Sequence, residues 1–135
     1  LERAVQEHVV GGPMFVYHGP PQLYWRTGNK PPTPLVFPTH LSQALERNVS
    51  HLDTLAETRR VLALRPGAVV ISETIQPGPP NRETLLLVHA YIHRNCRKVA
   101  VVGVPDWRYS SNVEVWGDCA APPASSGGDK YPARR

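Results

Sequence analysis

The segment from Met14 to His40 constrains the fold most, because apolar runs and proline-rich turns alternate within it. Its first part, residues 14–17 (Met-Phe-Val-Tyr), is apolar throughout and lies between Pro13 and Gly19. Such a short apolar run between turn residues is typical of a strand that is buried on both faces. We therefore expect a central strand here, with the following loop at its carboxyl end.

The remainder of this segment predicts a short helix and then a second strand. Residues 23–25 (Leu-Tyr-Trp) fit one or two helical turns. Residues 29–34 cannot be helical, because each of their prolines lacks a backbone donor and favours an extended predecessor. Residues 35–37 (Leu-Val-Phe) follow as the expected second strand, and Pro38 after them indicates a sheet edge.

Helical and strand patterns continue to alternate along the rest of the chain, which predicts an α/β fold. We expect a single three-layer domain over residues 1–118, with a mostly parallel sheet of about five strands and the last strand antiparallel at an edge. Residues 119–135 are rich in proline, serine and glycine, and predict a flexible tail. Further helices are expected over 1–10, 40–47, 50–64 and 82–94, and further strands over 68–71, 98–104 and 113–116.

Size and charge narrow the class of protein only moderately. A chain of 135 residues that is 41% hydrophobic is long enough for one domain with a proper core. Its net charge of +4 suits an anionic membrane surface without requiring one, and we expect no nucleic-acid partner. No apolar run is long enough to span a bilayer. Because Leu1 stands where a start methionine would, we expect a piece of a longer chain.

The two cysteines, Cys96 and Cys119, can form one disulfide if the compartment is oxidising. The sequence does not fix the distance between them, so two free thiols remain the alternative.

A pair of histidines, His89 and His93, has the spacing that places two imidazoles on one face of a helix. Ala90 stands where a metalloprotease has its glutamate. Surface histidines are therefore the better interpretation, and we predict no metal site.

Polar residues at the ends of the predicted strands offer a second candidate site. Ligands of open α/β sheets bind at the carboxyl ends of strands, where His18, Glu73 and Asp106 are expected. These three side chains suit acid-base chemistry. The alternative is an ordinary loop rim, since most buried strands end in polar residues. The glycines form no phosphate-binding pattern, and no nucleophile motif is present, so we predict neither catalytic residues nor a cofactor.

Aromatic and polar residues after the first strand suit contact with a sugar or another acceptor. An indole can stack on a sugar ring, although packing of the helix on the sheet explains the aromatic residues equally well. Asn48-Val49-Ser50 also matches a glycosylation sequon, a pattern that is common by chance. The candidate ligand-binding residues from both regions are His18, Tyr24, Trp25, Asn29, Lys30, Glu73, Asp106 and Trp107.

The run from Phe15 to Ser42 resembles the C-terminal soluble region of bacterial integral-membrane glycosyltransferases of the GT-C superfamily, in the dolichyl-phosphate-mannose-protein mannosyltransferase-like group. The layout of the later segments extends this resemblance over residues 1–117. Asn29 and Lys30 replace the usual arginine pair, and Pro34 replaces a basic residue, which puts any role of those arginines in doubt here. The residues that carry the resemblance are Phe15, Val16, Gly19, Pro21, Leu23, Tyr24, Gly28, Pro31 and Phe37.

The resemblance implies an accessory domain on the periplasmic or extracytoplasmic face of the cytoplasmic membrane. Its partners would be the membrane-embedded part of the same polypeptide and a glycan or protein acceptor, and its parent would transfer a sugar from a polyprenyl-phosphate donor. The family's catalytic acid lies in a loop outside this chain, so no catalytic residue carries over. The alternative is a stand-alone, non-catalytic α/β binding or interaction module. A third hypothesis is a small enzyme that uses His18, Glu73 and Asp106.

Overall fold

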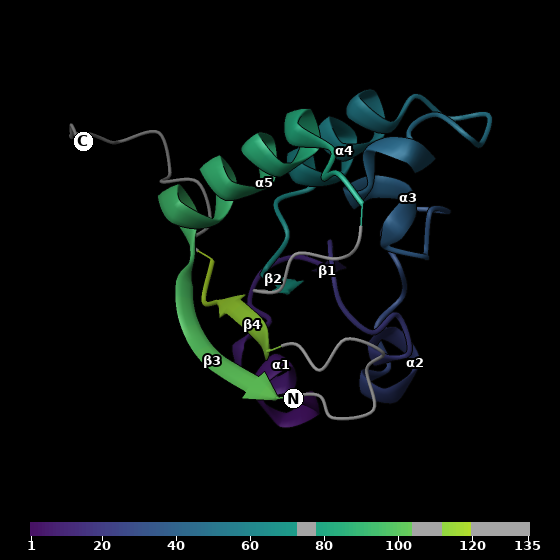
Figure 1. The fold of residues 1–135 in the computed structure, drawn as a ribbon. Helices are drawn as coiled ribbons and strands as arrows, with labels where there is room; N and C mark the ends of the chain where they lie inside the picture. The colour runs from purple at the N-terminus through teal and green to yellow at the C-terminus, as the bar shows by residue number, and fades with distance from the viewer. Residues whose placement is uncertain (73–77, 104–111, 120–135) are drawn as a thin grey trace, which may run out of the picture.

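The computed structural model describes residues 1–72, 78–103 and 112–119, which contain a sheet with strand order β1-β2-β4-β3 (Figure 1). The residues predicted to form the tail, 120–135, lie outside these ranges. The strands are β1 (Met14–Val16), β2 (Ala68–Ser72), β3 (Arg97–Gly103) and β4 (Asn112–Gly117). The helices are α1 (Glu2–His8), α2 (Leu23–Thr27), α3 (Thr39–Ser42), the 3-10 turn η1 (Ala44–Glu46), α4 (Thr54–Ala63) and α5 (Arg82–Asn95).

The sheet is mixed. β1 pairs with β2 in parallel, whereas β4 pairs antiparallel with β2 on one side and with β3 on the other. It follows that β1, β2 and β3 run in one direction and that β4 runs against them. Helices combined with a mixed sheet agree with the predicted α/β class. The described residues, however, form four strands and not about five, and two of their three pairings are antiparallel where a mostly parallel sheet was predicted.

The positions of the last two strands differ from the prediction. β4 is antiparallel as expected, yet it lies inside the sheet, and β3 takes the edge. The alternation of Val113 and Val115 with polar or aromatic residues resembles a half-exposed edge strand. In fact the opposite face of β4 is also covered, since Trp116 is only 9% exposed. Every residue of β3 is exposed or partly exposed, although the strand is rich in valine.

The strand expected at residues 35–37 is absent, and this prediction was wrong. Leu35 is buried, but its backbone N–H donates to the side-chain oxygen of Thr33 at 3.1 Å instead of to a neighbouring strand. Pro34 and Pro38 on either side have no N–H to donate. A local side-chain acceptor and two missing donors thus leave this segment as irregular chain that packs on the core.

Successive residues of the strands contribute to two hydrophobic clusters. One cluster joins Phe15 and Val69 to α4 and α5, and the other joins Val16 and Val70 to α1 and α2. Figure 1 shows the same arrangement, with α4 and α5 on one side of the strands and α1 and α2 on the other. The alternation of side chains along each strand explains it.

Side-chain caps begin the two long helices. The side chain of Asn81 accepts from the N–H of Thr84 at the start of α5, which was expected over residues 82–94. The side chain of Asp53 accepts from the N–H of Ala56 at 2.8 Å, so α4 begins at Thr54 and not at Ser50. These side chains satisfy amide groups that the helix itself leaves unpaired.

The buried face of α4 is not apolar throughout. Its buried residues are Thr54, Glu57, Thr58 and Val61. Glu57 can be buried because it accepts from the hydroxyl of Thr33 at 2.6 Å and pairs with Arg60 at 2.7 Å. A satisfied carboxylate therefore replaces the expected apolar contact.

A disulfide joins Cys96, just after α5, to Cys119, just after β4. Cys119 is 5% exposed, and its N–H donates to the carbonyl of Gly67 at 3.3 Å. The folded part of the chain therefore includes Cys119, which the predicted boundary assigned to the tail. Among the described helices, none combines the length and the apolar character needed to cross a membrane.

Candidate functional site

The structure places only one member of the predicted acid-base group. His18 follows β1 and is 9% exposed, and its backbone N–H donates to the carbonyl of Val70 at 3.2 Å. Glu73, Asp106 and Trp107 lie outside the described residues. Two members of the predicted triad thus lie outside the described ranges, and the triad stays a prediction.

Tyr24 has a structural position. It is 1% exposed, and its hydroxyl accepts from the backbone N–H of Val16 at 2.8 Å, which ties α2 to β1. Burial raises the pKa of Tyr24 to about 12. A ring enclosed in this way packs in the core and cannot stack on an incoming sugar.

The neighbouring residues form an accessible group, which we call the α2 surface and define as Trp25, Asn29 and Lys30. Trp25 is 66% exposed and Lys30 is exposed, while the side chain of Asn29 donates to the hydroxyl of Thr27 at 2.8 Å. Gly28 ends α2 with a φ of 70°, a left-handed conformation that stops the helix just before Asn29 and Lys30. An exposed indole, with an amide and an ammonium group shortly after it in the chain, suits a carbohydrate or an anionic acceptor.

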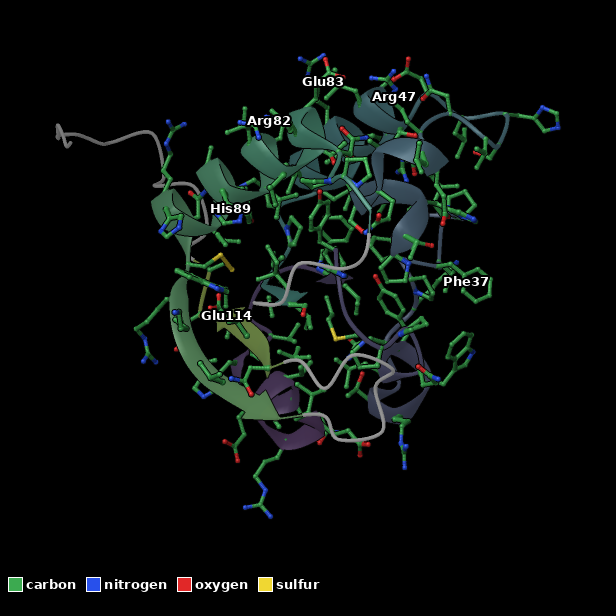
Figure 2. The ribbon with its side chains drawn as sticks, viewed as in Figure 1. Phe37, Arg47, Arg82, Glu83, His89 and Glu114 are labelled. Carbon is green, nitrogen blue, oxygen red and sulfur yellow. A yellow bond between two sulfur atoms is a disulfide. The ribbon has the colours of Figure 1, made fainter. Side chains whose placement is uncertain are left out.

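Phe37 extends the aromatic character of this side of the molecule. It is 60% exposed, and its ring meets the ring of His40 edge-on at 6.1 Å. Figure 2 shows Phe37 pointing outward from the segment that connects α2 to α3. Sequence analysis placed Phe37 in an expected strand. Its exposure was not foreseen, because it results from the absence of that strand.

A second group, unpredicted as a unit, joins α5 to β4 and β3, and we call it the α5–β4 cluster. Trp116 donates from its indole nitrogen to Glu114 at 2.8 Å, and the ammonium of Lys98 lies 3.2 Å from the other oxygen of Glu114. Lys98 also lies 5.5 Å from the centre of the Trp116 ring. On the helix side, the centre of the His93 ring lies 4.8 Å from that of the Trp116 ring, which it meets edge-on. The centre of the His89 ring lies 5.8 Å from that of the His93 ring.

The surroundings of His89 lower the pKa of this histidine. Burial lowers the pKa of His89 first, the charge of His93 lowers it further, and the carboxylate of Glu114 opposes both effects. In Figure 2, His89 on α5 and Glu114 on β4 lie in the region between α5 and the β3–β4 pair. An imidazole, a carboxylate and an ammonium group can together bind a polar ligand. The described residues contain no group of three or more side chains suited to hold a metal ion.

The sequence contained part of the signal for this cluster. The spacing of His89 and His93 is visible in the sequence, and it suggested either a metal site or two surface histidines. Their link to Trp116 depends on β4 pairing between β2 and β3, which brings Lys98 opposite Trp116. That pairing joins distant segments, so local patterns do not reveal it.

No family model, curated protein or solved structure matches this chain. Its function is therefore inferred from its residues and their geometry.

Proposed function

We propose that this chain is an extracytoplasmic accessory domain of an integral-membrane glycosyltransferase that uses a polyprenyl-phosphate-linked sugar. The observation that carries the proposal is the disulfide between Cys96 and Cys119, the only two cysteines of the chain. Disulfides persist in oxidising compartments such as the periplasm, and reducing systems keep cytosolic thiols free. A domain on the outer face of the membrane fits this chemistry.

The proposed role of the domain is to hold the acceptor or to cover the membrane active site. The α2 surface supports this role, because Trp25 is two-thirds exposed and is followed closely in the chain by an amide side chain and an exposed cationic one. Large exposed aromatic residues commonly mark binding surfaces. Lys30 is suited to the anionic groups of lipid headgroups and sugar phosphates. In the proposed domain, α4 with α5 and α1 with α2 form the two outer layers around the sheet.

Substitutions in the full-length parent enzyme test the proposal. Trp25→Ala and Lys30→Ala, singly and together, should lower sugar transfer in membranes without changing the amount of inserted protein. Because both side chains are exposed, their removal should leave the stability nearly unchanged. Transfer is measured with a radiolabelled polyprenyl-phosphate sugar and the native acceptor.

Leu86→Ala is the matched control for this experiment. Leu86 is 67% exposed, close to the exposure of Trp25, but it lies on α5. Transfer should be unchanged in this variant. The double variant, Trp25→Ala with Lys30→Ala, can be compared with the parent and with the control. Equal transfer by all three would remove the α2 surface from the proposal.

The alternative function is a stand-alone, non-catalytic binding module. The α5–β4 cluster favours it, because this cluster is built entirely within the chain and needs no membrane partner. The coding sequence upstream of Leu1 separates the two functions. Many apolar spans there support the membrane enzyme, whereas a start codon or a signal peptide directly upstream supports the module.

A further inference from the structure

The loop between η1 and α4 contains the one Asn-x-Ser/Thr tripeptide of the sequence, Asn48-Val49-Ser50. This tripeptide is the acceptor pattern for N-linked glycans. Glu46 lies two positions before the asparagine. Bacterial-type oligosaccharyltransferases additionally require an acidic residue at that position, so the loop carries the longer and more specific pattern Glu-x-Asn-x-Ser.

The conformation of Asn48 leaves its amide nitrogen available. Its backbone has a φ of 58°, a left-handed conformation that asparagine tolerates well. The side-chain oxygen accepts from the N–H of Thr54 at 2.8 Å, and the hydroxyl of Thr54 accepts from the N–H of Asn48 at 2.8 Å. No described residue accepts a hydrogen bond from the Nδ2 atom of Asn48. The loop thus fixes the oxygen of the amide and leaves the nitrogen free to react.

The rest of the loop is open to an enzyme. Val49 is 62% exposed, and Ser50 and His51 are exposed as well. Figure 1 shows this segment, just before α4, extending away from the sheet. A valine exposed to this degree takes no part in the core. The tripeptide is therefore accessible in the folded chain.

We propose that Asn48 is the acceptor of an N-linked glycan. The Nδ2 atom of Asn48 attacks the anomeric carbon of a polyprenyl-diphosphate-linked oligosaccharide, held by an oligosaccharyltransferase. The new carbon–nitrogen bond forms as the bond from that carbon to the diphosphate oxygen breaks, and the diphosphate leaves with the electron pair. One Nδ2 proton passes to a base of the enzyme. The side-chain oxygen can still accept from Thr54, so the fold is compatible with the product.

The test uses the folded, disulfide-bonded chain with a purified oligosaccharyltransferase of the class that requires the acidic residue. Intact-mass spectrometry should show one added glycan on the natural chain and on Ser50→Thr, and none on Ser50→Ala or Glu46→Gln. Asn48→Asp should also remain unmodified. This variant keeps an oxygen acceptor for Thr54 and tolerates the left-handed backbone, so loss of glycan would not reflect a collapsed loop.

A control variant tests whether the accessibility of the loop matters in addition to the acceptor pattern. Pro79→Glu together with Glu83→Ser, in the Ser50→Ala background, creates the full pattern Glu-x-Asn-x-Ser at Asn81, which is 4% exposed. The folded variant should receive no glycan. An unmodified natural chain, or equal transfer to Asn81, would overturn the proposal.

The proposal rests on the proposed function only for its extracytoplasmic location. Peptide mapping of the protein from its source cells should find the glycan on Asn48, and a glycan-free Asn48 beside other glycosylated exported proteins would overturn it. Because neither assay measures transfer by the parent enzyme, the failure of one proposal is distinguishable from the failure of the other.

Discussion

The two ends of the sheet are stabilised by different kinds of interaction. In β1 and β2 the residues from Met14 to Val16 and from Ala68 to Ile71 are at most 4% exposed, with a hydrophobic cluster on each face. In β3, Val101 is 48% exposed. This edge strand is instead tied by the adjoining disulfide, by the pair of Lys98 with Glu114, and by Arg97, whose guanidinium bonds to Asp118. Burial stabilises one end of the sheet, and covalent and charged contacts stabilise the other.

This difference indicates which conditions each end should resist. Full burial of a large apolar side chain contributes about 1.5–3 kcal/mol and is insensitive to reductants. Exposed ion pairs contribute less than about 1 kcal/mol and weaken with salt. We therefore expect the β3 end to respond to reduction and ionic strength, and the β1–β2 end to respond mainly to loss of volume.

The largest effect is expected from Phe15→Ala. Phe15 is fully buried, and its truncation should lower the free energy of unfolding by about 3–5 kcal/mol through lost burial and a cavity. Val101→Ala at the other end should change it by about 0.5 kcal/mol or less. Urea unfolding of both variants measures the difference. Similar losses in the two variants would contradict the contrast between the ends.

Removal of the disulfide should have the next largest effect. Cys96→Ala with Cys119→Ala should cost about 3 kcal/mol, because the bridge closes a loop with a sequence separation of 23 residues. Hydrogen exchange should accelerate more in β3 and at the end of α5 than in β1. Uniform acceleration across the sheet would show that the bridge supports both ends alike. In cells, alkylation trapping should find both cysteines oxidised.

Alkaline pH should destabilise the β1 end specifically. Burial raises the pKa of Tyr17 and of Tyr24 from 10 to about 12 in the folded protein. The stabilisation is complete below pH 10 and is lost as the pH rises from about 10 through 12, since only the unfolded chain releases these protons easily. Each tyrosine should account for about 2 kcal/mol. Unfolding curves between pH 9 and 12, with Tyr17→Phe for comparison, should show a shallower decline in the variant.

The smallest effect is expected from Glu114→Gln. The pair of Glu114 with Lys98 is partly exposed, so its loss should cost less than about 1 kcal/mol, and the cost should shrink in high salt. The pKa of His89 should fall further in this variant, because the carboxylate of Glu114 raises it in the natural protein. NMR titration of the histidines measures this shift. An unchanged titration of His89 would separate this histidine from the α5–β4 cluster.

The same contrast explains what the sequence could predict. Buried strands such as those in residues 14–17 and 68–71 can be recognised from the local sequence alone. The structure confirms both strands. The valine-rich run of β3 looks equally buried, but its exposure depends on β4 taking the inner position. The strand expected at residues 35–37 was lost to a local hydrogen bond with Thr33, which apolar patterning does not reveal.

The candidate site was predictable to a smaller extent. Trp25 and Lys30 are exposed, whereas Tyr24 packs inward, as the alternative of helix packing on the sheet expected, and its hydroxyl accepts from the backbone of β1. The α5–β4 cluster required knowledge of which strands pair. Contacts between distant segments of the chain therefore decided what local patterns left open.

The most direct test of the central claim is sugar transfer by the full-length parent enzyme with and without residues 1–119. Membrane insertion of both forms is verified first, so that a change in transfer reflects the domain itself. The form lacking the domain should transfer less sugar from its polyprenyl-phosphate donor to the acceptor. Undiminished transfer by the correctly inserted, truncated enzyme would contradict it.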